Sequence, residues 1–173
     1  MPGAGKSLVA EYLKQAGYPI VVMGDVIRAK TEQRGLEPTP ETLREIMLKI
    51  RRDEGLGAVA RYCIPKIRKA KSRVVVIDGL RSLEEVDEFK KEFSGFILIA
   101  VHCSPKTRFK RLYLRERSDD PKLWAEFLER DLRELRVGLG AVIAMADYII
   151  INEGAKAQLE STTRRLIRRI VQE

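Results

Sequence analysis

The sequence predicts a three-layer α/β fold built around a parallel sheet. Short apolar runs, such as Val74–Ile77 and Tyr148–Ile151, alternate with longer stretches in which apolar residues recur at helical spacing. This alternation is typical of parallel strands joined by helices. The chain has 173 residues, of which 45% are hydrophobic and 34% are charged. Such a chain can bury one core, and we expect a single domain over residues 1–173.

The first half of the chain predicts a helix, a strand and then a long helical region. The helix follows Ser7, and the apolar run Tyr18–Met23 predicts a short buried strand. Residues 28–71 keep helical spacing, and Thr39 with the proline after it is typical of a helix start. The breaks in this region fall at Gly35–Pro38 and Gly55–Gly57.

The second half alternates more regularly between strands and helices. Val74–Ile77 is apolar throughout, which indicates a parallel strand buried on both faces. Ser82 and Glu85 have the spacing of a capping box at the start of the next helix. The remaining expected elements are strands at 97–102 and 148–151, a helix capped by Ser104 and the proline after it, and an amphipathic helix over 155–172.

The opening residues fit a phosphate-binding loop. Met1–Ser7 matches the pattern G-x-x-x-x-G-K-S/T from its second position onward. Backbone N–H groups of such a turn, backed by a helix N-terminus, form a concavity for phosphate oxygens. Lys6 is expected to reach the β- and γ-phosphates, and Ser7 to bind Mg²⁺. The predicted phosphate-binding residues are Gly3, Ala4, Gly5, Lys6 and Ser7. The alternative is a chance glycine-rich turn before a helix.

The first strand of a complete phosphate-loop fold is missing from this sequence. The pattern's first glycine and the strand that normally precedes it would both lie before Met1. We expect Met1 to be an internal methionine of a longer natural chain, about ten residues short. If the chain starts here, nucleotide affinity should be poor. The sequence then predicts four parallel strands, with those ending at Asp78 and His102 either flanking a gap or closed together.

Asp78 is the second candidate metal ligand. It ends the strand Val74–Ile77, so it should lie at the carboxyl edge of the sheet, where α/β folds bind ligands. A carboxylate there would hold Mg²⁺ directly or through water. The alternative is an ordinary Asp-Gly turn at a strand end.

Two segments resemble adenylate kinases. Met23–Ala29 looks like their acceptor-site segment, and Asp78–Arg81 resembles their Asp-Gly-x-x-Arg stretch. The resemblance implies that Arg28 and Arg81 grip the acceptor phosphate. The stretch around Arg115 and Arg117, which includes Ser118 and Asp119, resembles the arginine-rich flanks of the adenylate kinase lid. The resemblance to adenylate kinases implies a very short lid at about residues 111–136 and a helical acceptor-binding insertion at about residues 28–72. Arg111, Arg130 and Arg133 fit either the lid or a solvated, ion-paired helix.

A further segment, Ala146–Gly154, looks like dephospho-CoA kinases, whose corresponding loop contacts the adenine. That resemblance implies nucleotide binding by Asn152 and Gly154. Over nearly all its residues, the chain most closely resembles an uncharacterised archaeal family of adenylate-kinase-related P-loop proteins. The resemblance implies a nucleoside-monophosphate-kinase-like fold with ATP and Mg²⁺ as cofactors.

Three functions remain open from the sequence. The first is a kinase that transfers the γ-phosphoryl group of ATP to a nucleoside monophosphate or similar phosphate-bearing small molecule, with Lys6, Arg115 and Arg117 stabilising the transferred charge. The second is a kinase for a hydroxyl acceptor of the dephospho-CoA type, for which Asp25 is the candidate base. The third is a nucleotide-binding switch protein with little catalysis, for which RNA is a candidate partner.

Composition narrows the partners. The net charge of +8 indicates that the protein attracts anions. No apolar run approaches the length of a membrane span, and no export leader is visible. Cys63 and Cys103 have no metal-ligand spacing, so we expect reduced core cysteines and a cytoplasmic protein. Nucleic acid is disfavoured as a partner, because no aromatic-interleaved basic platform is present. The sequence does not indicate an oligomeric state.

Overall fold

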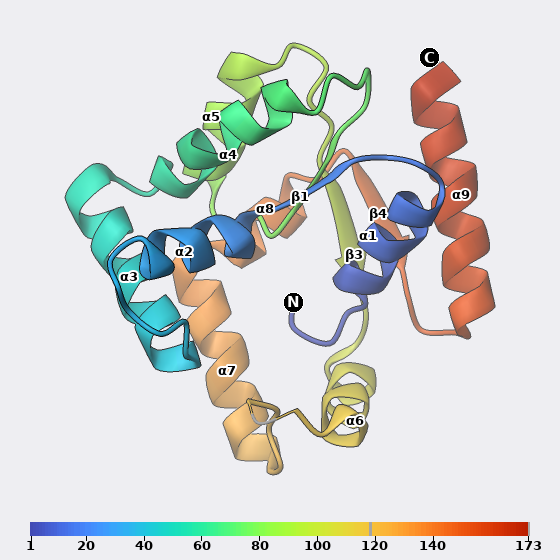
Figure 1. The fold of residues 1–173 in the computed structure, drawn as a ribbon. Helices are drawn as coiled ribbons and strands as arrows, with labels where there is room; N and C mark the ends of the chain where they lie inside the picture. The colour runs from blue at the N-terminus through green and yellow to red at the C-terminus, as the bar shows by residue number, and fades with distance from the viewer. Residues whose placement is uncertain (118, 173) are drawn as a thin grey trace. The chain divides into compact units, whose positions relative to one another are not determined.

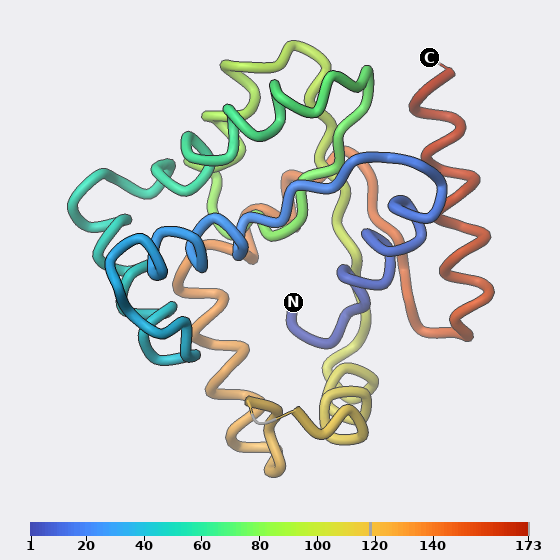
Figure 2. Tube along the Cα trace, in the orientation of Figure 1, coloured from blue at the N-terminus to red at the C-terminus, as the bar shows by residue number. Residues whose placement is uncertain are grey.

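The computed structural model describes residues 1–117 and 119–172. Ser118, which belongs to the lid motif predicted above, lies outside the described residues. The chain divides into two compact units. We call residues 1–17 with 97–172 the phosphate-loop unit and residues 18–96 the inserted unit. Figure 2 follows the chain as it leaves α1 for the inserted unit and later returns through β3. The single domain predicted from the sequence stays a prediction.

The phosphate-loop unit contains a pair of parallel strands, β3 and β4, with Ile99 opposite Tyr148 and His102 opposite Ile151. Helices α1 and α9 pack against each other, and α9 also contacts β4 (Figure 1). Phe127 and Leu112 are among its fully buried side chains. The elements are α1 (Lys6–Gln15), β3 (Ile99–His102), α6 (Pro105–Arg115), α7 (Trp124–Val137), α8 (Leu139–Ala144), β4 (Tyr148–Ile151) and α9 (Lys156–Gln172).

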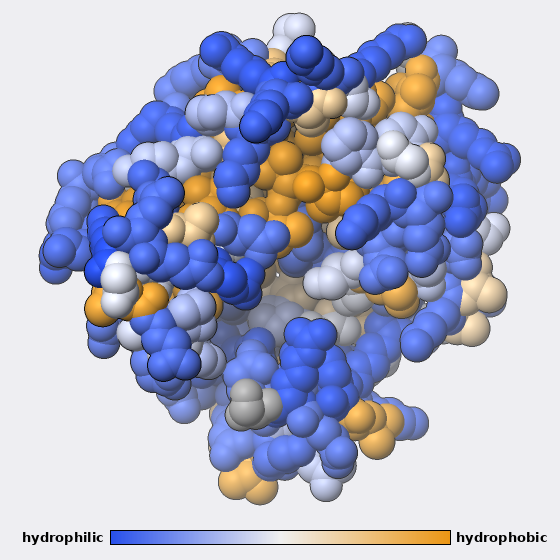
Figure 3. All heavy atoms as spheres, viewed as in Figure 1, coloured by the Kyte–Doolittle hydropathy of each residue, from blue (hydrophilic) through white to orange (hydrophobic). Residues whose placement is uncertain are grey.

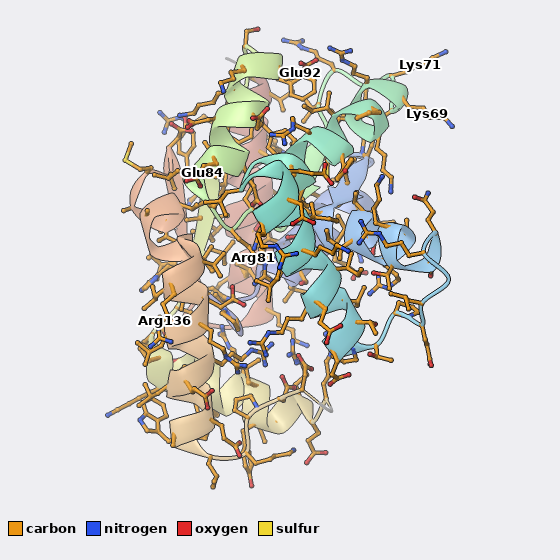
Figure 4. The ribbon with its side chains drawn as sticks, turned by 90° about the vertical axis from the view of Figure 1, so that its left-hand side faces the viewer. Lys69, Lys71, Arg81, Glu84, Glu92 and Arg136 are labelled. Atoms are coloured by element: carbon orange, nitrogen blue, oxygen red, sulfur yellow. The ribbon has the colours of Figure 1, made fainter. Side chains whose placement is uncertain are left out.

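The inserted unit contains the second parallel pair, β1 and β2, with Ile20 opposite Val76 and Val22 opposite Asp78. Its helices enclose an apolar core in which Phe89 and Ile50 are almost fully buried. The elements are β1 (Ile20–Val22), α2 (Met23–Glu32), α3 (Pro40–Glu54), α4 (Ala58–Lys69), β2 (Val76–Asp78) and α5 (Leu83–Glu92). In Figure 4, Glu84 and Glu92 lie on α5, and Lys69 and Lys71 extend outward at the end of α4.

The predicted strands are found, but their limits and burial differ. The strand predicted over Tyr18–Met23 is shorter, because Met23 already begins α2. The strand predicted over Val74–Ile77 is shifted to Val76–Asp78 and only half-buried, so burial on both faces is wrong. Among the described strands, β2 pairs with β1 alone. The strands ending at Asp78 and His102 belong to different pairs, so the alternative in which they close together is wrong.

The caps predicted at Thr39 and Ser82 are confirmed, whereas Ser104 is the N-cap residue of α6 but makes no side-chain capping hydrogen bond. The Thr39 hydroxyl accepts a hydrogen bond from the Thr42 amide at 3.3 Å and caps α3. The Ser82 hydroxyl accepts from the Glu85 amide at 3.4 Å. In a complete capping box the Glu85 carboxylate would accept from the Ser82 amide. Here it accepts instead from the Arg81 amide, at 2.8 Å.

The visible face in Figure 3 is largely hydrophilic, which agrees with the charge-rich composition. Over the described residues, no helix is both long enough and apolar enough to cross a membrane.

Candidate functional site

The phosphate loop is a tight turn that leads directly into α1. The Ala4 amide donates to the Met1 carbonyl at 3.2 Å, and Gly3 has a φ of +79°. With Pro2 at its second position, this is the geometry of a type II turn. Gly5 is the N-cap of α1, with a φ of +100° and no side chain to cap the helix. The N-cap residue therefore offers no side-chain acceptor to the first-turn amides of α1, and the Leu8 amide donates to the Gly5 carbonyl oxygen at 3.0 Å. Lys6 and Ser7 are exposed at this end of the helix.

Both glycines of the loop are required by packing as well as by backbone conformation. A Cβ on Gly3 would lie 2.9 Å from the Arg108 carbonyl oxygen. A Cβ on Gly5 would lie 2.3 Å from Asn152 Nδ2. Glycine also leaves the phosphate side of such a loop open to a close approach by a ligand. The structure adds that the opposite side has no room for a side chain either.

That opposite side is held by two side chains. Asn152 Nδ2 donates to the Ala4 carbonyl oxygen at 2.8 Å, in a buried position. Arg108 Nη1 donates to the Pro2 carbonyl oxygen at 3.3 Å. Arg108 also forms a buried two-pronged ion pair with Asp131 on α7, at 2.7 and 2.5 Å. Arg108 was not predicted from the sequence, and no local signal could have found it, because Asp131 is 23 residues away.

Residues of α6 and its N-cap form hydrogen bonds with Asn152 and Glu153 in the loop after β4. Arg111 Nη1 donates to the Asn152 carbonyl oxygen at 2.9 Å. The Glu153 carboxylate accepts from the Thr107 hydroxyl at 2.7 Å and from the Ser104 amide. These hydrogen bonds, that of Thr107 first, lower the pKa of Glu153. The side chain of Asn152 thus binds the phosphate loop, and its backbone binds α6. Adenine contact by Asn152 and Gly154 stays a prediction.

The two predicted lid arginines surround one buried carboxylate. Arg115 binds Asp120 through Nε at 2.8 Å and Nη2 at 2.5 Å. The Arg117 backbone amide donates to the same carboxylate at 3.0 Å, while the Arg117 side chain is exposed. The hydrogen bond from Arg115 is the main cause that lowers the pKa of Asp120. Arg130 donates to the Asp119 carbonyl oxygen at 2.9 Å. The catalytic roles of Arg115 and Arg117 stay predictions.

The predicted acceptor residues lie at one edge of the inserted unit. Parallel strands β1 and β2 end side by side at Val22 and Asp78, and α2 begins at the next residue after β1. Gly79 has a φ of +120°, and a Cβ there would lie 3.3 Å from Met23 Cβ. Its close approach brings the segment after β2 against the start of α2. On α2, Arg28 and Asp25 form an exposed ion pair at 2.6 Å.

The backbone at Arg81 is fixed by a buried ion pair that was not predicted from the sequence. Glu85 is fully buried; its carboxylate accepts from the Arg81 amide at 2.8 Å and from Arg51 Nη2 at 2.7 Å. Arg51 Nε and Nη1 are buried without a hydrogen-bond partner among the described residues. Arg81 itself is half-buried at the base of α5 (Figure 4).

The candidate metal ligands are oxygen donors, which is what Mg²⁺ prefers. Ser7 presents an exposed hydroxyl at the start of α1, and Asp78 is a buried carboxylate at the end of β2. Within residues 1–117 and 119–172, no group of three or more His, Cys, Asp or Glu side chains could hold a metal ion. In nucleotide sites generally, Mg²⁺ takes one or two protein ligands and completes its coordination with phosphate oxygens and water.

Comparison with known proteins places the chain in a family. A family model described as an AAA domain matches residues 1–127. The UPF0200 protein of Pyrococcus furiosus is 51% identical over 171 residues, which covers 96% of this chain and 92% of that protein. The UPF0200 protein of Thermococcus gammatolerans is 45% identical over 175 residues, covering 99% and 92%.

Two solved structures share the fold. The protein TT1252 from Thermus thermophilus superposes with a TM-score of 0.65 and covers 97% of this chain and 93% of its own, at 17% identity. The shikimate kinase from Bacteroides thetaiotaomicron superposes with a TM-score of 0.55 and covers 95% and 90%, also at 17% identity. The chain thus shares its α/β fold with these two proteins, and it belongs to the archaeal UPF0200 protein family and to the AAA domain family.

Proposed function

We propose that the protein is an ATP- and Mg²⁺-dependent phosphotransferase that acts on a nucleoside monophosphate or a similar phosphate-bearing small molecule. The observation that carries the proposal is the start of α1. Two glycines with positive φ lead into a helix N-terminus without a side-chain cap, beside exposed Lys6 and Ser7. Oriented amides and a lysine at a helix N-terminus are suited to a polyphosphate.

Each predicted residue then has a distinct task. The loop amides and Lys6 would bind the β- and γ-phosphates. Ser7 and Asp78 would hold Mg²⁺, which neutralises phosphate charge when bound. Arg115 and Arg117 would stabilise the charge on the phosphoryl group in transit. Arg115 would have to leave Asp120 in order to do so, because the two side chains are paired in this structure.

The acceptor would be held by Arg28 and Arg81. A phosphate acceptor is already ionised at neutral pH and needs no general base, so arginine contacts and orientation are sufficient. The ion pair between Asp25 and Arg28 favours this reading, since a phosphate could replace the carboxylate on the guanidinium. The second candidate is a hydroxyl acceptor, for which the exposed Asp25 carboxylate would serve as the base.

The proposal is tested by calorimetric titration of Mg-ATP into the wild type and the Lys6→Ala variant. Because a hydrogen bond to a charged group contributes about 1.5–3 kcal/mol, we expect affinity to fall by about tenfold or more. Lys14→Ala removes an exposed lysine from the other end of α1 and should bind Mg-ATP like the wild type. Equal affinities for wild type and Lys6→Ala would overturn the proposal.

The acceptor is identified by measuring ADP formation with AMP, other nucleoside monophosphates and dephospho-CoA. Asp25→Asn then separates the two candidates. Near-normal turnover supports the phosphate acceptor, whereas a collapse of turnover with ATP affinity retained supports the hydroxyl acceptor. A wild type that binds Mg-ATP but transfers no phosphoryl group to any acceptor would instead support the nucleotide-binding switch.

A further inference from the structure

We propose that Asn152 is a positioning residue for the phosphate loop, and that its amide sets the direction of the Ala4–Gly5 peptide. This inference rests on the proposed function, since it assumes that the loop binds a polyphosphate. It differs from the adenine contact that the resemblance implies for the same residue. The observation behind it is the buried hydrogen bond of 2.8 Å from Asn152 Nδ2 to the Ala4 carbonyl oxygen.

The direction of a loop amide follows from peptide geometry. In a planar trans peptide, the carbonyl group and the N–H group of the next residue point in opposite directions. A donor that holds the Ala4 carbonyl oxygen on one side of the loop therefore turns the Gly5 N–H to the other side. With this peptide reversed, the loop would present a carbonyl oxygen, and hence negative charge, to an anion on that side.

Glycine makes such an anchor necessary. Gly3 and Gly5 have positive φ values, a region that only glycine enters at low cost, and the same freedom lets their peptides turn. Local preference therefore restrains the peptides beside these glycines less than it would beside other residues. Asn152 fills the space behind Gly5 so closely that a Cβ there would lie 2.3 Å from its Nδ2 atom.

Asn152 is itself firmly held. Only 6% of its surface is exposed, and its backbone carbonyl oxygen accepts from Arg111 Nη1 at 2.9 Å. A second anchor acts earlier in the loop, where Arg108 binds the Pro2 carbonyl oxygen and so directs the Gly3 N–H. Arg108 and Asn152 thus each bind the carbonyl oxygen of the peptide group that precedes one of the two glycines.

The two roles for Asn152 predict different dependence on the base. A residue that orients loop amides affects every ligand with a polyphosphate tail, with or without adenine. A residue that contacts adenine affects ATP but not inorganic tripolyphosphate. Comparing these two ligands therefore separates the roles in a way that a general loss of stability does not.

The test is calorimetric titration of Mg-ATP and Mg-tripolyphosphate into the wild type and Asn152→Asp. The aspartate has nearly the same shape but no amide donor, and its carboxylate would face the Ala4 carbonyl oxygen. We expect affinity for both ligands to fall by a similar factor of about tenfold. Thr163→Val is the control, because the buried Thr163 hydroxyl donates within α9, to the Leu159 carbonyl oxygen at 2.7 Å. It should leave both affinities unchanged.

Each other outcome has a defined meaning. If Asn152→Asp weakens ATP alone, Asn152 is a base contact and the inference is wrong. If it weakens neither ligand, the loop does not depend on this anchor and the inference is also wrong. If the wild type itself binds neither ligand, the proposed function fails first. Should Asn152→Asp not fold, Asn152→Ala makes the same comparison, because it also lacks the donor and leaves room for water.

Discussion

Replacing Gly5 by alanine tests how closely Asn152 packs against the phosphate loop. The new Cβ would lie 2.3 Å from Asn152 Nδ2, so the amide would have to move and its hydrogen bond to the Ala4 carbonyl oxygen would be lost. Leaving a buried acceptor unpaired costs about 1–3 kcal/mol. The positive φ of 100° adds about 1–2 kcal/mol for any residue with a Cβ.

Two matched variants separate these contributions. Gly17 has a φ of +92°, and a Cβ placed on it would have no neighbouring atom within 4 Å, so Gly17→Ala carries only the conformational cost. Gly24 lies within α2, also has open space, and should become more stable by about 0.5–1 kcal/mol as alanine. Gly5→Ala should therefore be less stable than Gly17→Ala by about 1–3 kcal/mol.

The assay is guanidinium unfolding. Trp124, the one tryptophan of the chain, lies in the same unit as Gly5 and Gly17, so its fluorescence reports their effects; far-ultraviolet circular dichroism follows Gly24→Ala. If Gly5→Ala loses no more stability than Gly17→Ala, the steric reasoning about Asn152 is refuted.

Three further predictions concern charge and burial. The pKa of the Asp120 carboxyl lies below its ordinary value of 3.8, chiefly because Arg115 donates a hydrogen bond to it. The ionised carboxylate therefore stabilises the folded state fully above about pH 4, and this stabilisation is lost as the pH falls through the lowered pKa. Asp120→Asn should be less stable at neutral pH and show a weaker dependence of stability on acid pH; an unchanged acid unfolding profile would contradict this. Burial raises the pKa of the Cys63 thiol to about 11, so this thiol should react slowly with iodoacetamide at neutral pH in the folded protein. Labelling as fast as in the unfolded chain would show that Cys63 is not buried. Glu85→Ala leaves Arg51 buried without a counter-charge and should lower the free energy of unfolding by about 3–5 kcal/mol, measured in guanidinium. The double variant Arg51→Met with Glu85→Leu removes both charges and should recover much of that loss. A double variant no more stable than Glu85→Ala would count against the buried ion pair.

Features that depend on neighbouring residues were predictable from the sequence. The strand at Tyr148–Ile151 has the limits predicted for it, and Thr39 caps the helix that it was expected to start. The glycine-rich loop likewise leads into α1 as its spacing indicates. In each case the determining interactions lie within a few residues along the chain, so the local pattern contains the needed information.

Features that depend on distant residues were not predictable. The ion pair of Arg51 with Glu85 joins residues 34 positions apart, and Glu85 looked like half of a local capping box. Asn152 was assigned to adenine because its sequence context resembles an adenine-binding loop, whereas its side chain is bonded to Ala4, 148 positions away. The half-buried state of β2 depends on which strands are its neighbours, and apolar composition alone does not specify that.

The inserted unit interrupts the phosphate-loop unit at a single point, between Gly17 and Ile97, and has its own strand pair and its own apolar core. Each unit thus has buried apolar side chains of its own, such as Phe89 in the inserted unit and Phe127 in the phosphate-loop unit. On the proposed function, the acceptor residues Arg28 and Arg81 lie within residues 18–96, whereas Lys6 of the phosphate loop lies outside this segment. On the same proposal, relatives that differ mainly within residues 18–96 would keep the phosphate loop but bind different acceptors.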